Sequence, residues 1–199
     1  MSQLVHSKEP QLTLRQIVEL QFSGAPQAAH DAYIEFFQHN EPDYNALNLF
    51  GICCVSLKKL EKAEKIFEHV VQEAPHINEA RLHLANCRFD LGKMDQALSA
   101  LVGQDDCDLE GIEEKIIRAK VYVALDQKKQ AKDELGSAMN FNPRKPDELL
   151  RIARLQEIVG NANDARKLYK KVLFNNPKNC APLNPNEDLN KTTNGNPNF

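Results

Sequence analysis

Apolar residues recur along this chain with a period of 34. The period is clearest in five alanines: Ala29, Ala63, Ala97, Ala131 and Ala165. A large apolar residue stands four positions after each alanine: Tyr33, Phe67, Leu101, Leu135 and Tyr169. A repeat of this length is typical of stacked helix–turn–helix units, none of which can bury its apolar face alone. The pattern therefore predicts an all-α repeat array.

Laid out on this period, the chain predicts five pairs of helices. Their expected bounds are 11–22 with 27–39, 45–57 with 60–73, 79–91 with 94–102, 113–125 with 128–141, and 147–159 with 162–175. Gly24, Gly92 and Gly160 lie five residues before an alanine, where the first helix of a pair should end and turn. Pro75 and Pro143 lie twelve residues after an alanine, where proline would end the second helix.

One unit has the fullest set of repeating positions. Its residues are Leu47, Phe50–Gly51, Cys54, Leu60, Ala63, Phe67, Val70 and Pro75. This set resembles the tetratricopeptide repeat (TPR), although Cys54 replaces the usual tyrosine and Val70 replaces the second alanine. Other units carry Ala85, Ala119 and Ala153 where this unit has Gly51, whereas the first has Ile17.

The resemblance covers residues 10–179 and implies a right-handed superhelical solenoid of antiparallel helix pairs. The repeats would span 10–43, 44–77, 78–111, 112–145 and 146–179. Residues 1–9 would form an N-terminal extension. Residues 180–199, rich in Asn and Pro, predict a disordered tail.

The segment Gly103–Gly111 interrupts the end of the third repeat. It holds two glycines and four acidic residues, which favours a solvated acidic turn. A calcium site is the alternative, although the acidic spacing does not fit an EF-hand loop.

Composition narrows the classes of function. The net charge of −3 gives no argument for nucleic-acid binding, and no stretch is long and apolar enough to insert into a membrane. Among five cysteines, Cys53 and Cys87 hold equivalent positions in neighbouring repeats, about 8–10 Å apart and too far for a disulfide. Small buried thiols are expected instead. Without a hydrophobic signal core at the N-terminus, we expect a cytoplasmic protein.

The sequence predicts no catalysis, cofactor or metal. It contains no glycine-rich phosphate loop and no nucleophile elbow, and its six histidines are scattered. His69 and His76 are seven residues apart, but Pro75 separates them. We therefore do not expect an enzyme.

In TPR proteins the first helices of the repeats line a concave groove, and the resemblance places candidate ligand contacts there. They are Asn48, Ile52, His83, Asn86, Phe89, Lys120, Arg151 and Arg154. Amides such as Asn48 and Asn86 can hold the backbone of an extended peptide. Apolar positions could receive side chains, and the cations could attract a carboxylate. The alternative is a solvated face whose polar groups bond to one another.

The clamp for the C-terminal carboxylate of chaperones is disfavoured, because Glu113 and Ile117 occupy places that the clamp gives to other residues. The leading hypothesis is a non-catalytic scaffold that binds a protein or peptide partner in the groove. An alternative is the substrate-recruiting N-terminal module of a bacterial-type sulfotransferase or glycosyltransferase whose catalytic domain lies outside this chain. Self-association through the fifth repeat is a third possibility.

Overall fold

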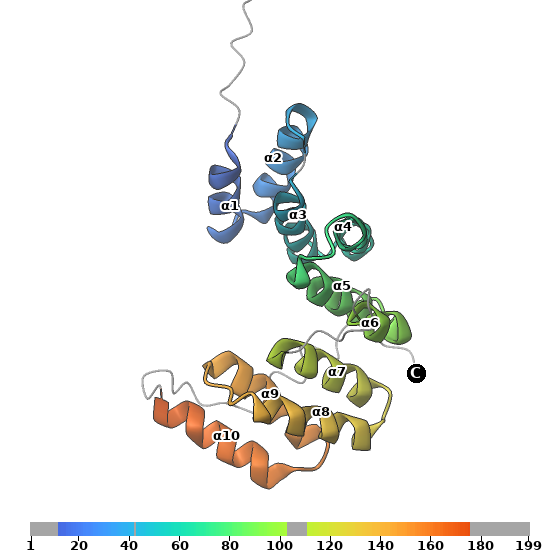
Figure 1. Ribbon diagram of the computed structural model, residues 1–199. Coiled ribbons are helices and arrows are strands. Elements are labelled where there is room, and N and C mark those ends of the chain that lie inside the picture. The colour runs from blue at the N-terminus through green and yellow to red at the C-terminus, as the bar shows by residue number, and fades with distance from the viewer. Residues whose placement is uncertain (1–11, 42, 103–110, 176–199) are drawn as a thin grey trace, which may run out of the picture. The chain divides into compact units, whose positions relative to one another are not determined.

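The computed structural model describes residues 12–41, 43–102 and 111–175. In these ranges it consists of helices joined by short turns (Figure 1). The helices are α1 (Leu14–Phe22), α2 (Pro26–His39), α3 (Tyr44–Ser56), α4 (Leu60–Glu73), α5 (Asn78–Asp90), α6 (Met94–Ala100), α7 (Ile112–Ala124), α8 (Lys128–Asn140), α9 (Pro146–Ile158) and α10 (Ala162–Asn175). The expectations for residues 1–9, 103–110 and 180–199, including Cys107 and Cys180, lie outside the described residues.

The predicted helices are confirmed, with every end within three residues of its expected position. The largest difference is at the start of α1, which begins at Leu14 because Thr13 is its N-cap. The Thr13 hydroxyl accepts from the backbone of Gln16, whose side chain accepts from the Thr13 backbone N–H in return. Such a capping box fixes a helix start, and only its Ser or Thr and its Glu or Gln show in a sequence.

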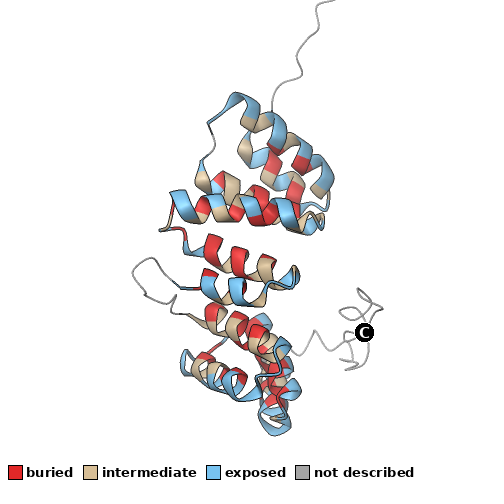
Figure 2. Ribbon diagram, turned by 90° about the vertical axis from the view of Figure 1, so that its right-hand side faces the viewer, coloured by how far each residue is buried: buried red, intermediate tan, exposed pale blue. Residues whose placement is uncertain are grey.

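The chain divides into two compact units. The first extends to Phe141 and contains α1–α8, and the second begins at Asn142 and contains α9 and α10. In the first unit the helices pack as the pairs α1–α2, α3–α4, α5–α6 and α7–α8, and contacts of α2 with α3, α4 with α5 and α5 with α7 join neighbouring pairs. Buried residues lie where helices face one another, and exposed residues lie on the outer faces (Figure 2). The fold is that of stacked antiparallel helix pairs.

The five periodic alanines are buried, each at most 1 % exposed. Their partners Tyr33, Phe67, Leu101 and Leu135 are fully buried as well. Tyr169 in the second unit is partly buried, and its hydroxyl donates to Glu157 Oε2 at 3.0 Å. The apolar period therefore marks the packing face of the second helix in every pair.

The turns inside the pairs follow the same period. Gly24, Gly92 and Gly160 have positive φ angles of 90°, 75° and 89°, as their place at the end of a helix predicted. Lys58 and Asp126 hold the equivalent positions and also have positive φ, at 60° and 54°. The repeat thus requires a left-handed residue here even where the sequence does not supply glycine.

The buried cysteines confirm the expected free thiols and show a repeated contact. Cys53, Cys54 and Cys87 are free and buried. The Cys53 thiol donates to the carbonyl oxygen of Pro26 at 3.3 Å, and the Cys87 thiol donates to that of Leu60 at 3.2 Å. Burial raises the pKa of Cys87 to about 11, with smaller contributions from nearby acidic groups, so this thiol stays protonated at neutral pH.

An ionic cluster connects α4 to α5 and to the turn that follows α5. Glu64 Oε1 accepts from Arg88 Nε at 3.3 Å, and Glu64 Oε2 accepts from Lys93 Nζ at 2.6 Å. Arg88 also pairs with Glu68 at 2.6 Å. Burial would raise the pKa of Glu64, but the hydrogen bonds and positive charges of Lys93 and Arg88 outweigh it and lower that pKa.

We predict that Gly51→Ala destabilises the first unit, because the new Cβ would lie 2.7 Å from Cζ of the Phe67 ring. Overpacking of this kind costs about 1–3 kcal/mol. The matched control is Gly136→Ala on α8, where nothing lies within 4 Å of the added methyl group. The control should raise the unfolding free energy by about 0.5–1 kcal/mol. Denaturant melts of the two variants check this, and a Gly51→Ala protein as stable as wild type would contradict the close approach.

We predict that the Glu64 cluster makes stability fall in acid. Because the folded-state pKa of Glu64 lies below its ordinary value of 4.5, the stabilisation is complete at pH values above 4.5 and is lost as pH falls through the folded-state pKa. Glu64→Gln should cost about 1–3 kcal/mol at neutral pH and flatten this acid decline. Urea melts from pH 7 to pH 3 measure both effects. Glu73→Gln, at an exposed end of α4, should keep the wild-type decline; equal profiles for both variants would refute the assignment.

Candidate functional site

Six of the eight predicted contact residues lie in the first unit, on three first helices that touch in sequence. These residues are Asn48 and Ile52 on α3, His83, Asn86 and Phe89 on α5, and Lys120 on α7. Contacts of α3 with α5 and of α5 with α7 bring the helices side by side. We refer to these six residues as the first-helix surface.

Asn48 is the unusual residue of this surface. Its side-chain oxygen Oδ1 is buried, yet it accepts no hydrogen bond from the protein. A buried carbonyl without a donor costs free energy, about 1–3 kcal/mol for a neutral group. The side chain of Asn48 as a whole is partly buried, so the amide lies at the edge of the packed layer. An acceptor in this position can take a donor that a ligand brings.

Asn86, on the next first helix, has found a partner. Its side-chain Nδ2 donates to the carbonyl oxygen of Leu82 at 3.2 Å, one turn earlier on α5. Leu82 O is the acceptor, so the side-chain oxygen of Asn86 is not used in that bond. The two amides therefore differ in what they offer: Asn86 is held against its own helix, and Asn48 is not.

Phe89 and Lys120 are brought together across α5 and α7. The Lys120 ammonium lies 3.9 Å from the centre of the Phe89 ring, which is a cation–π contact. It also lies 3.5 Å from Asp90 Oδ1. The sequence analysis did not select Asp90, although it follows Phe89 at the thirteenth position of its repeat. The acid partly neutralises Lys120, so this end of the surface is less cationic than the sequence suggested.

His83 and Ile52 are packed rather than projecting. The His83 ring stacks on Phe67, with centroids 5.4 Å apart and planes 26° apart. Burial lowers the pKa of His83, against a smaller opposing effect of Glu79, and the ring is therefore neutral at pH 7. Ile52 is partly buried against the core of the first unit. These two residues form an apolar floor beside the amides.

Arg151 and Arg154 lie on α9, in the second unit. Arg151 Nε is 3.2 Å from Asp147 Oδ2, one turn earlier on the same helix. Arg154 is exposed. Both residues are thus described with their own unit.

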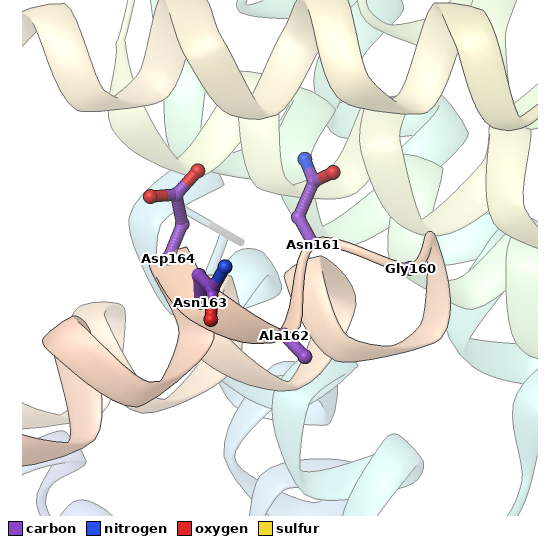
Figure 3. Close-up of a pocket in the computed structure, with 5 residues that line it drawn as sticks. All are labelled: Gly160, Asn161, Ala162, Asn163 and Asp164. Atoms are coloured by element: carbon purple, nitrogen blue, oxygen red, sulfur yellow. The ribbon is translucent and has the colours of Figure 1, made fainter.

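A small surface pocket lies in the second unit, at the turn from α9 into α10. Its lining runs from Gly160 to Asp164 (Figure 3). The polar groups here already have local partners: Asn161 Nδ2 donates to Gln156 Oε1 at 2.7 Å, and Lys167 Nζ donates to Asp164 Oδ1 at 2.8 Å. The pocket is part of the helix turn.

Two searches of the described residues bear on other kinds of site. No three His, Cys, Asp or Glu side chains in these ranges gather closely enough to hold a metal ion. No helix in the same ranges has both the length and the apolar character needed to cross a bilayer. The first-helix surface itself offers amides, an apolar floor and a shielded cation, which are groups that bind rather than react.

Comparison with known proteins places this geometry in a family. Residues 58–106 match the model of the tetratricopeptide repeat. No curated protein sequence matches the chain. Several solved structures share its fold at low identity, which establishes the fold alone.

Three of these structures illustrate the range. TTC0263, a TPR protein of Thermus thermophilus, is 22 % identical with a TM-score of 0.71, over 83 % of this chain and 91 % of that one. MamA from Desulfovibrio magneticus is 16 % identical with a TM-score of 0.61, over 84 % and 96 %. PilF of Pseudomonas aeruginosa is 15 % identical with a TM-score of 0.62, over 83 % and 75 %.

The repeat model covers the end of α3's turn, α4, α5 and α6, and the same helix-pair design recurs in the other described pairs. The period of 34 residues, the buried alanines and the left-handed turns all follow that design. Together with the shared fold, they identify this chain as a tetratricopeptide repeat protein.

Proposed function

We propose that this TPR protein is a non-catalytic scaffold and that its first-helix surface binds an extended segment of a partner protein. TPR arrays are built for protein–protein contacts, and this chain has the repeat and the fold. The observation that carries the proposal is the buried, unpartnered Oδ1 of Asn48. A backbone N–H of a bound peptide would satisfy it.

The neighbouring groups support the same kind of ligand. The Asn86 side chain can exchange its bond to Leu82 for one to a peptide carbonyl, and the neutral ring of His83 keeps the surface between the two amides uncharged. Phe89 and Lys120 close the surface at α7. An extended backbone, which presents donors and acceptors in alternation, fits two amides separated by apolar ground.

Arg151 and Arg154 remain proposed contacts for an acidic group of the partner, and they act from the second unit. The repeat boundaries of the sequence analysis and the cytoplasmic location are also carried forward as proposals. No further candidate function has an observation of its own behind it.

We predict that Asn48→Ala/Asn86→Ala weakens partner binding by about ten-fold, because each lost hydrogen bond contributes about 0.5–1.5 kcal/mol. Affinity capture from a native lysate, followed by titration of the purified partner, measures the loss. Both alanines favour helix, so the double variant should melt at or above the wild-type temperature.

The matched control is Asn140→Ala/Asn163→Ala, which removes two exposed amides from the second helices α8 and α10. It should bind like wild type. Equal weakening in both double variants would refute the assignment to the first-helix surface. Capture of the chain's own mass alone, with a doubled mass in light scattering, would replace a foreign partner with self-association.

A further inference from the structure

A second polar cluster lies on the second helices of the first two pairs, away from the first-helix surface. Its centre is His30 on α2, which is only 5 % exposed. The ammonium groups of Lys59 and Lys62 lie 3.2 Å and 3.1 Å from the same ring nitrogen, Nε2. The other ring nitrogen, Nδ1, lies 2.9 Å from Asp31 Oδ1.

This arrangement leaves positive charge without a matching partner. If Nδ1–H donates to Asp31, Nε2 is the acceptor, and its single lone pair serves one ammonium at a time. In the described part of the chain, neither Lys59 nor Lys62 forms an ion pair with a carboxylate. The Asp31 carboxylate is held at the other ring nitrogen, where Gln27 also donates to it at 2.9 Å.

The next repeat shows what this lysine position binds. Lys93 follows Lys59 by 34 residues, and Glu64 follows His30 by the same interval. There, Lys93 Nζ donates to Glu64 Oε2 at 2.6 Å. The same position on two successive second helices thus holds a carboxylate in one repeat and an uncharged ring in the other. What the first repeat lacks is a negatively charged oxygen between its lysines.

We propose that Lys59 and Lys62 bind a phosphate group, whose oxygens take the place of the carboxylate that Glu64 provides one repeat later. A phosphate group carries about −1.5 to −2 charges at pH 7, enough to balance two ammonium groups. Hydrogen bonds between charged partners are roughly twice as strong as neutral ones.

Two further features favour an anion at this place. Lys62 is exposed, so a ligand can reach it, and its ammonium lies 4.7 Å from the centre of the Phe50 ring, which holds it near His30. Helix α4 begins at Leu60 without a side-chain cap, so its positive end adds to the attraction. The cluster belongs to the first unit and does not depend on the proposed peptide contacts.

We predict that inorganic phosphate binds wild type at constant ionic strength and shifts the NMR signals of the His30 ring. Lys59→Gln/Lys62→Gln should weaken this binding by about ten-fold or more, because two charge-assisted hydrogen bonds are lost. The charge-matched control is Lys65→Gln/Lys129→Gln, which neutralises two exposed lysines of α4 and α8. It should change the affinity by less than about two-fold, as expected for screened surface charges. No His30 shift in wild type, or equal losses in both variants, would overturn the proposal.

A second variant tests the comparison between repeats. His30→Glu places a carboxylate where Glu64 stands one repeat later, and it should raise the melting temperature in phosphate-free buffer and abolish the response to phosphate. If His30→Glu unfolds, His30→Gln keeps a neutral acceptor and should still bind phosphate. A folded His30→Glu protein that binds phosphate like wild type would contradict the proposed site.

The ligand source is resolved by comparing inorganic phosphate with a short phosphoserine peptide. Equal affinity assigns the site to free phosphate, and tighter binding of the peptide assigns it to a phosphorylated protein. Acetate binding as tightly as phosphate would overturn the preference for a dianion. Asn48→Ala/Asn86→Ala should bind phosphate like wild type, which separates this test from that of the peptide surface.

Discussion

The close approach of the two helices in each pair is the constraint on which the rest of this structure depends. Where α3 meets α4, Gly51 leaves room that the Phe67 ring fills, and a single added carbon would collide with it. The same position holds Ala85, Ala119 and Ala153 in later pairs, all fully buried. Small residues on one helix and large ones on the other recur every 34 residues because each pair repeats this contact. Polar variation is confined to the positions that the contact does not use.

Much of the fold could be predicted from this contact alone. The alanines and their large partners gave every helix pair, and Gly24, Gly92 and Gly160 gave three of the left-handed turns. Lys58 and Asp126 were missed, because a residue's type does not reveal a left-handed backbone when the residue is not glycine. The turn there is imposed by the helices on either side. Local preference yields to packing at these two positions.

The candidate site was less predictable, since its chemistry depends on which polar groups find each other across repeats. Sequence placed Phe89 and Lys120 on neighbouring helices, but it could not show that they touch or that Asp90 joins them. It proposed Asn48 and Asn86 as equals, and only the geometry separates a bonded amide from an unpartnered one. The peptide-binding role of these residues stays a prediction.

A repeat protein contains its own comparison set, because equivalent positions meet equivalent surroundings. Cys53 and Cys87 donate to equivalent carbonyl groups, so one sequence position fixes one contact in two repeats. Glu64 and His30 occupy another shared position but differ in charge, while the lysine that faces each of them is kept. Shared packing makes that difference interpretable, since geometry is nearly constant and only the chemistry changes. A position that departs from its repeats without any need of packing is therefore where a function specific to this chain is to be sought.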